Sequence, residues 1–274
     1  MHDRPTAIIR QGNNGGLIAA RFPKTPSEMH EALLGRGDWT KSDSGIWLCD
    51  DSSTQLVDSS ANANHLVSIG AAPTYRDTGK LPDYKDRVVN FGNSGYSNCC
   101  FTVSDVNRFE LTGTKHMIIV AVQKQNAVSV FPYVYCGGKI NTGGTGKYWG
   151  WYSNTSSHWG IVWNNTVTNG NSIVTVNHKD GNYHLMLILV ERGYGTQTMT
   201  ELGKSALNIN NLGSCDNPTT GLALGRYTGV LQPTVAMSIA FLGVLQSDDA
   251  SCVGMVSNIS KIHYNFRKWT GLLP

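Results

Sequence analysis

Charged residues are scarce in this chain. Asp, Glu, Lys and Arg make up 15% of its 274 residues, and the formal net charge is only +3. The Lys and Arg residues are scattered along the sequence, so we expect no basic patch of the kind that binds nucleic acid. Low charge together with 30 glycines favours many strands and tight turns over helices or disorder.

Long apolar segments are missing as well. The run Leu185–Val190 has six residues, whereas a membrane-spanning helix needs about 20, so we expect no membrane insertion. Residues 1–5 lack the basic segment and apolar stretch of a secretory signal.

The six cysteines include no Cys-x-x-Cys pair, which disfavours a zinc ribbon. Without an export signal we expect free, mostly buried thiols, with disulfides as the alternative.

The signatures of common hydrolytic sites are also missing. A glycosidase places two carboxylates about 5–10 Å apart, but the chain has only five Glu residues, and none lies two or four positions from another acid on a plausible strand. It has no Gly-x-Ser-x-Gly and no His-Glu-x-x-His motif. Cys136 and His184 could meet as a nucleophile and its base, but a buried structural cysteine is the favoured interpretation. We therefore expect that the protein is not an enzyme.

What the chain has is a succession of short apolar runs separated by Gly, Asn and Ser, which is typical of strands and turns. Residues 115–123 and 182–190 are nearly continuous apolar runs, as expected of central strands. The pattern predicts an all-β fold, a two-sheet antiparallel β-sandwich. The expected strands are residues 46–49, 55–57, 65–69, 87–91, 98–103, 115–123, 128–136, 147–152, 158–164, 172–177, 182–190, 197–201, 221–224 and 235–246.

The two ends of the chain differ from this pattern. Residues 1–45 contain a short apolar piece at 8–10 and a predicted helix at 26–35, where Ser27 can cap the first turn. This segment either docks on a partner as an arm or packs along its own sandwich. At the other end, a helical period over residues 256–269 predicts a C-terminal helix against the sandwich edge.

Several short motifs follow one another in an order that carries a resemblance. They are Trp47, Asp58–Asn64, Val89–Tyr96, Asn182–Leu185, Leu222–Gly225, Val244–Asp248 and Tyr264–Leu272. In this order they resemble the laminin-G-like domains of the concanavalin A-like lectin-glucanase superfamily, found in microbial and phage surface proteins. The resemblance implies a jelly-roll domain over residues 46–274, preceded by an N-terminal arm at 1–45. Ala61 and Ala63 depart from it, because glycine is usual at both places.

The richest candidate site is the aromatic stretch from Lys147 to Trp163. Strand alternation puts Trp149 and Trp151 on one face and Tyr148 and Tyr152 on the other, and the next strand can pair with this one as a hairpin. Aromatic faces beside amides and hydroxyls are typical of sugar sites, while the alternative is an aromatic ladder that only stabilises the sheet. The predicted glycan-binding residues are Tyr148, Trp149, Trp151, Tyr152, Asn154, His158 and Trp159.

The resemblance also raises the question of calcium, which the superfamily often binds. Asp50, Asp51 and Asp58, with Asn62 or Asn64, could supply oxygen ligands. The favoured interpretation is that these residues form turns by hydrogen-bonding their own backbone. We therefore expect no metal and no cofactor.

These observations predict a non-enzymatic virion surface protein, of the capsid-decoration or tail-fibre type. Virus assembly and lysis would bring an adhesion-type fold to the outside without an export signal. The expected partners are viral structural proteins or sister subunits in a homo-oligomer on the particle, and cell-surface glycan. The alternative is a cellular lectin or an accessory module of a carbohydrate-active enzyme. The predicted docking residues of the arm are Ile8, Ile9, Arg10, Met29, Leu33 and Leu34.

Overall fold

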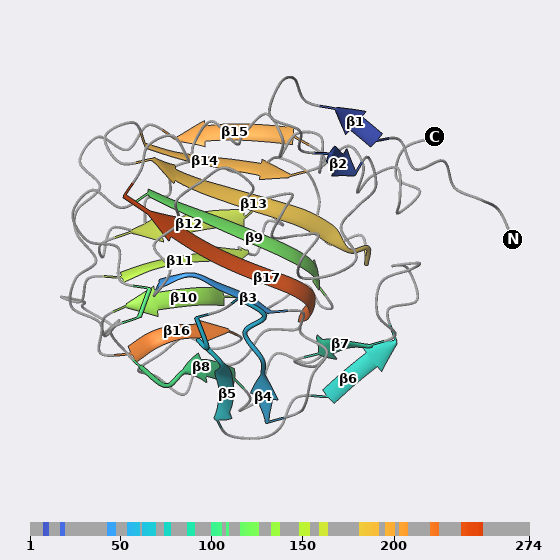
Figure 1. Ribbon diagram of the computed structural model, residues 1–274, viewed down its shortest axis with the longest axis vertical. Helices are drawn as coiled ribbons and strands as arrows, with labels where there is room; N and C mark the ends of the chain where they lie inside the picture. Colours follow the sequence, from blue (N-terminus) through green and yellow to red (C-terminus); the bar gives the residue numbers. More distant parts are fainter. Residues whose placement is uncertain are drawn as a thin grey trace, which may run out of the picture.

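The regular structure formed by the described residues is made of strands (Figure 1). Within the residues that are described there is no α-helix, and so none that is long and apolar enough to span a membrane. The helices expected at 26–35 and 256–269 lie outside these residues. The computed structural model describes residues 8–10, 17–19, 43–47, 54–60, 62–69, 74–77, 87–90, 100–105, 108–109, 116–125, 133–137, 148–153, 159–163, 181–191, 195–200, 203–207, 220–224 and 237–248.

One layer is an eight-stranded sheet in which all described pairings are antiparallel. Seven strands follow one another across it, and the eighth, β3 (Gly45–Trp47), pairs with β17. In spatial order the seven are β15 (Gly203–Leu207), β14 (Gly195–Thr200), β13 (His184–Glu191), β9 (His116–Gln125), β17 (Met237–Ser247), β7 (Arg87–Asn90) and β6 (Thr74–Asp77).

The second layer is a seven-stranded sheet, and its described pairings are also antiparallel. A separate two-stranded sheet joins β1 (Ile8–Arg10) to β2 (Leu17–Ala19). In spatial order the seven strands are β12 (Trp159–Trp163), β11 (Tyr148–Ser153), β10 (Tyr133–Gly137), β16 (Thr220–Leu224), β8 (Cys100–Val103), β5 (Leu66–Ile69) and β4 (Gln55–Leu56).

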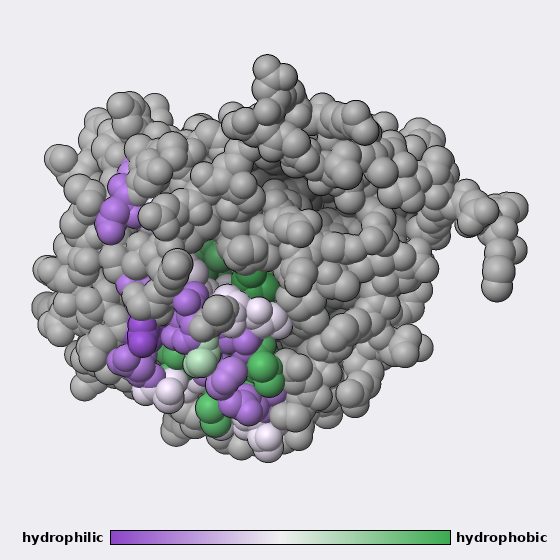
Figure 2. Space-filling view, in the orientation of Figure 1, coloured by the Kyte–Doolittle hydropathy of each residue, from purple (hydrophilic) through white to green (hydrophobic). Residues whose placement is uncertain are grey.

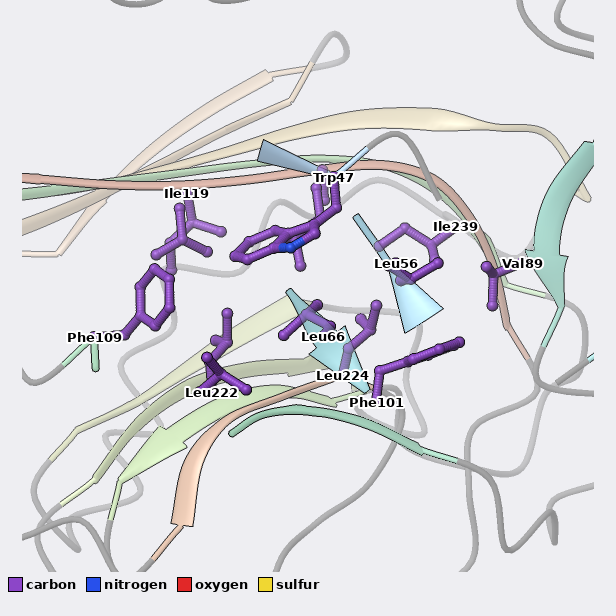
Figure 3. Close-up of a cluster of buried hydrophobic side chains, with 14 of the residues drawn as sticks. Trp47, Leu56, Leu66, Val89, Phe101, Phe109, Ile119, Leu222, Leu224 and Ile239 are labelled. Atoms are coloured by element: carbon purple, nitrogen blue, oxygen red, sulfur yellow. The ribbon is translucent and has the colours of Figure 1, made fainter. Parts of the chain in front are cut away.

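The hydrophobic core lies between these two sheets, so the predicted antiparallel β-sandwich is confirmed (Figure 3). In β9, alternate residues enter the cluster, because successive residues of a strand alternate between its two faces. In β17 this alternation is interrupted by a register shift between Ile239 and Phe241. The buried cluster contains Trp47, Leu56, Leu66, Val89, Phe101, Val103, Phe109, Met117, Ile119, Ala121, Met186, Ile188, Leu222, Leu224, Ile239, Leu242 and Val244.

The eight-stranded sheet is buried on both faces at its centre. In β9, Ile119 and Ala121 belong to the core between the sheets, while Val120 and Val122 lie on the opposite face and are also buried. Burial on both faces explains why this strand is a continuous apolar run. The prediction that residues 115–123 and 182–190 are central strands is therefore confirmed.

Two strands of this sheet were missed by the sequence pattern. The first, β6, carries the polar sequence Thr-Tyr-Arg-Asp, and the second, β15, begins Gly-Lys-Ser. Each stands at an end of the strand order and lacks a clean apolar alternation. β15 pairs antiparallel with β14 from Thr200↔Gly203 onward, so the two strands form a hairpin. The strand expected at 172–177 lies outside the described residues.

Candidate functional site

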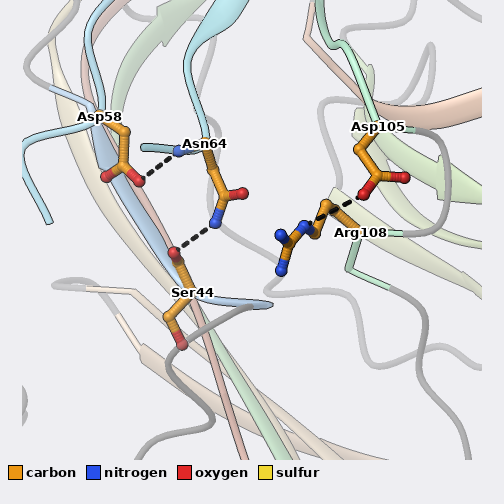
Figure 4. A network of polar contacts seen from close by, with 5 residues as sticks. All are labelled: Ser44, Asp58, Asn64, Asp105 and Arg108. Carbon is orange, nitrogen blue, oxygen red and sulfur yellow. Dashed lines mark hydrogen bonds and ion pairs between the residues drawn. The ribbon is translucent and has the colours of Figure 1, made fainter. Parts of the chain in front are cut away.

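The turn at residues 58–65, here called the Asp58 turn, is organised around one buried carboxylate (Figure 4). The backbone N–H groups of Ile46, Ser60 and Asn64 each donate to this carboxylate at 2.9 Å. The Ser60 hydroxyl donates to it at 2.8 Å. Four donors thus converge on Asp58, which ties the turn to strand β3.

The two asparagines of the same turn connect it to Ser44 and to the core residue Trp47. The side-chain amides of Asn62 and Asn64 both donate to the carbonyl oxygen of Ser44 at 2.9 Å. The indole N–H of Trp47 donates to the carbonyl oxygen of Asn64, also at 2.9 Å. The Trp47 ring packs at a tilt against Phe109, with 5.8 Å between ring centroids. The first motifs of the family resemblance, Trp47 and the Asp58 turn, are therefore joined by hydrogen bonds at the edge of the core. Trp47 together with the Asp58 turn is here called the clamp.

These contacts bear on the question of calcium. Asp58 accepts from backbone N–H groups of its own turn, as the favoured interpretation predicted, whereas the side chains of Asn62 and Asn64 donate to Ser44 on a distant segment. Asp50 and Asp51 lie outside the described residues, so a calcium site stays an untested alternative. Within the described part of the chain, no three His, Cys, Asp or Glu residues gather as a metal site would require.

The aromatic stretch forms the hairpin that its spacing predicted. β11 and β12 pair antiparallel, with Trp149 opposite Trp163 and Ser153 opposite Trp159. β10 lies on the other side of β11, and there Tyr133 is opposite Tyr152. Three adjacent strands at one end of the seven-stranded sheet therefore hold the aromatic residues together.

The register shows which face of these strands continues the core. Val134 pairs with the core residue Leu224 on one side and with Trp151 on the other. Residues opposite one another across a sheet share a face, so Trp151 occupies a position on the core side. Tyr135 pairs with Ala223, one position along, and so belongs to the opposite, outer side.

Alternation extends this assignment to the other aromatic positions. We call the inner positions the tryptophan face, which consists of Trp149, Trp151, Trp159 and Trp163. We call the outer positions the tyrosine face, which consists of Tyr133, Tyr135, Tyr148 and Tyr152.

The predicted glycan-binding residues thus do not share one face. Trp149, Trp151 and Trp159 belong to the inner positions, and Tyr148 and Tyr152 to the outer ones. The remaining two, Asn154 and His158, lie outside the described residues.

Three aromatic neighbours were absent from the predicted site, namely Tyr133, Tyr135 and Trp163. Two of them carried a usable signal, because Tyr-Val-Tyr places two tyrosines on one face of a strand. The structure adds that this strand lies beside β11.

The other predicted functional residues fall in different places. Ile8, Ile9 and Arg10 form β1 and pair with Ala19, Ile18 and Leu17. Met29, Leu33 and Leu34 lie outside the described residues, and a docking role for this arm stays a prediction. Cys136 and His184 belong to different sheets.

Comparison with known proteins bears on the fold. No family model matches the chain, and no curated protein matches it in sequence. A solved structure of Trypanosoma rangeli sialidase in complex with 2,3-difluorosialic acid aligns with a TM-score of 0.51 at 8% identity, over 82% of this chain and 33% of that one. The binding domain of Paraclostridial Mosquitocidal Protein 1 aligns with a TM-score of 0.50 at 12% identity, over 79% and 52%. The chain thus spans about a third of the first protein and about half of the second, and both likenesses support the β-sandwich fold.

Proposed function

We propose that this protein is a non-enzymatic β-sandwich that binds carbohydrate through strands β10, β11 and β12. The observation that carries the proposal is the concentration of aromatic residues there. These three adjacent strands hold four of the seven tryptophans of the chain, together with four tyrosines. Such a concentration at one end of a sheet gives both faces of that end an aromatic character.

The chemistry of sugar recognition fits this composition. A pyranose ring presents an apolar C–H face that stacks on an aromatic ring, and its hydroxyls require hydrogen-bonding partners. Tyrosine supplies both, because its ring is apolar and its hydroxyl both donates and accepts. A small number of such residues on a rigid sheet can hold an oligosaccharide without a deep pocket.

Other observations point in the same direction. One structural neighbour is described as a binding domain, and the other holds a sialic acid derivative. The order of motifs resembles laminin-G-like domains, which recognise surfaces. No Glu residue lies two or four positions from another acid on a plausible strand, and this supports binding without hydrolysis.

A glycan array probed with the labelled full chain tests the proposal. We expect a restricted set of glycans to be bound, and we expect each bound glycan to be recovered intact after prolonged incubation. An array without hits would overturn carbohydrate binding, and release of sugar products would overturn the non-enzymatic role. The variant Val67→Ser is a matched control, since Val67 is exposed on the same sheet at its other end.

We also propose that the protein sits on a virus particle and docks through residues 1–45, on viral structural proteins or on a sister subunit. In support, β1 and β2 form a small sheet separate from the two sheets of the sandwich. Co-sedimentation with purified particles tests this, with Ile9→Asp as the variant expected to reduce occupancy. Full occupancy by that variant, or absence from particles, would count against the proposal.

A further inference from the structure

The outer faces of the two sheets differ in their access to solvent. The outer face of the eight-stranded sheet is buried at Val120, Val122 and Leu187, each at most 1% exposed. The outer face of the seven-stranded sheet is open at Val67, which is 44% exposed, and Thr102 beside it is half-buried. Figure 2 shows hydrophilic and hydrophobic residues interspersed in the lower part of the view, where β4 and β5 lie in Figure 1. Of these two outer faces, the seven-stranded one is therefore the better candidate for contact.

The register traces this face without interruption to the aromatic end of the sheet. One row of directly opposed residues crosses six strands, and each member shares a face with the next. Ala223 in this row is buried, whereas Val67 and Thr102 keep access to solvent. The row is Val67, Thr102, Ala223, Tyr135, Gly150 and Val162.

At the aromatic end, tyrosine and glycine are paired on this face. Gly150 is opposite Tyr135, Gly137 is opposite Tyr148, and Gly160 is opposite Tyr152. A glycine inside a strand weakens the sheet, and it often marks a bulge, a bend, or a place where a ligand or another backbone approaches closely. The register of β10 with β16 shifts between Tyr135 and Gly137, so Gly137 lies at such an irregularity. Three such glycines beside tyrosines indicate a face that is shaped for contact.

The composition of this face also indicates the class of ligand. Its eight positions on β10, β11 and β12 carry four tyrosines, three glycines and one valine, and none of them is charged. An acidic sugar is usually held by Arg or Lys through charge-assisted hydrogen bonds. An uncharged face of rings and hydroxyls is suited to an uncharged oligosaccharide.

The size of the face indicates more than one sugar unit. The four residue steps from Tyr148 to Tyr152 extend about 13 Å along the strand, and three strands span about 10 Å across. These dimensions exceed a single pyranose ring and match a short, extended oligosaccharide.

From these placements we propose that the tyrosine face is the carbohydrate platform and that it takes a neutral, extended oligosaccharide. The inference rests on the proposed function and assigns it to one side of the sheet. The tryptophan face then serves to extend the core between the sheets.

Two matched sets of probes test this inference. The first set compares neutral oligosaccharides with the same oligosaccharides carrying a terminal sialic acid, using isothermal titration of the full chain. The second set compares Tyr152→Ala and Tyr135→Ala with Val67→Ser on the same outer face, with a urea unfolding curve for each variant. Tyr152→Phe removes only the hydroxyl and keeps the ring, so we expect it to fold even where a Tyr→Ala change does not.

We expect the neutral oligosaccharide to bind and its sialylated form to bind more weakly. Each Tyr→Ala change should weaken binding about tenfold, as truncation of an aromatic anchor commonly does, while Val67→Ser should leave affinity unchanged. Tyr152→Phe should retain most of the affinity. The unfolding midpoints of the tyrosine variants should stay close to that of the parent chain.

Different failures have different meanings. A parent chain that binds no glycan overturns the proposed function together with this inference. Glycan binding that survives both Tyr→Ala changes but is lost in a folded Trp149→Ala variant overturns the inference alone. Preference for the sialylated form overturns the ligand class. Unfolding of both Tyr→Ala variants shows that the chain itself packs against this face and overturns the platform.

Discussion

In β3 of the eight-stranded sheet, an aromatic residue is fixed from several sides: Trp47 is fully buried, donates a hydrogen bond to Asn64 and packs on Phe109. At the β11–β12 end of the seven-stranded sheet, aromatic residues alternate with glycines and are divided between two faces. The first arrangement stabilises the fold, whereas the second assigns four tryptophan positions to one face of the sheet and four tyrosine positions to the other. The difference indicates that the surroundings of an aromatic residue in the sheet, and not its type alone, guide the role that we propose for it.

The largest effect should follow from removing the tryptophan of the clamp. Trp47→Ala deletes a fully buried ring and its hydrogen bond, so the free energy of unfolding should fall by about 3–5 kcal/mol. Chemical denaturation followed by circular dichroism measures this. A loss below about 1 kcal/mol would show that the clamp does not carry the stability assigned to it, and Trp47→Phe should be milder because it keeps an aromatic ring.

A smaller loss should follow from changing the carboxylate of the clamp. In Asp58→Asn, an amide NH₂ replaces one of the two carboxylate oxygens. Each of these oxygens accepts from two donors, so at least one backbone N–H group is left facing another donor. Leaving a buried donor unsatisfied costs about 1–3 kcal/mol. Asp105→Asn is the control, because its ion pair with Arg108 at 3.3 Å is largely exposed and should be worth less than about 1 kcal/mol. Equal losses in the two variants would contradict the account.

Two glycines in paired strands offer a test of packing at the clamp. A Cβ at Gly45 would overlap the ring of Trp47, whereas a Cβ at Gly243 would lie 3.4 Å from the Phe241 ring in near-ordinary contact. Gly45→Ala should therefore lower the free energy of unfolding by about 1–3 kcal/mol through overpacking. Gly243→Ala should change it much less when measured in the same denaturation assay. If the order were reversed, the described position of the Trp47 ring would be wrong.

The smallest effect should be a gain in stability. Ala63 lies in the Asp58 turn with φ of 55°, in the left-handed region that costs a residue with a Cβ about 1 kcal/mol. This is one of the positions where the resembled family has glycine. Ala63→Gly should raise the free energy of unfolding by about 0.5–1 kcal/mol, and thermal unfolding would detect the change. A decrease would mean that the turn tolerates this conformation without strain.

Much of the fold could be predicted from the sequence, because burial leaves a pattern in it. The apolar runs that became β9 and β13 are continuous since both faces of those strands are buried. The strands β6 and β15 gave no such pattern, since each stands at an end of the strand order and carries polar residues or glycine. Their pairing partners, and not their own composition, define them as strands.

The candidate site was predictable in part. The spacing of Trp149, Trp151, Trp159 and Trp163 was sufficient to predict the hairpin, because a hairpin is a local structure. Which face of the hairpin continues the core depends on Val134↔Leu224, a pairing with a strand far along the chain. No local pattern contains that information, and so the predicted site mixed residues of both faces.

The most direct test of the central claim is a crystal structure of the full chain with a neutral oligosaccharide that it binds. The account predicts sugar rings over the outer face of β10, β11 and β12, in contact with Tyr135 and Tyr152. Sugar bound at the tryptophan face, or on loops away from these strands, would contradict it.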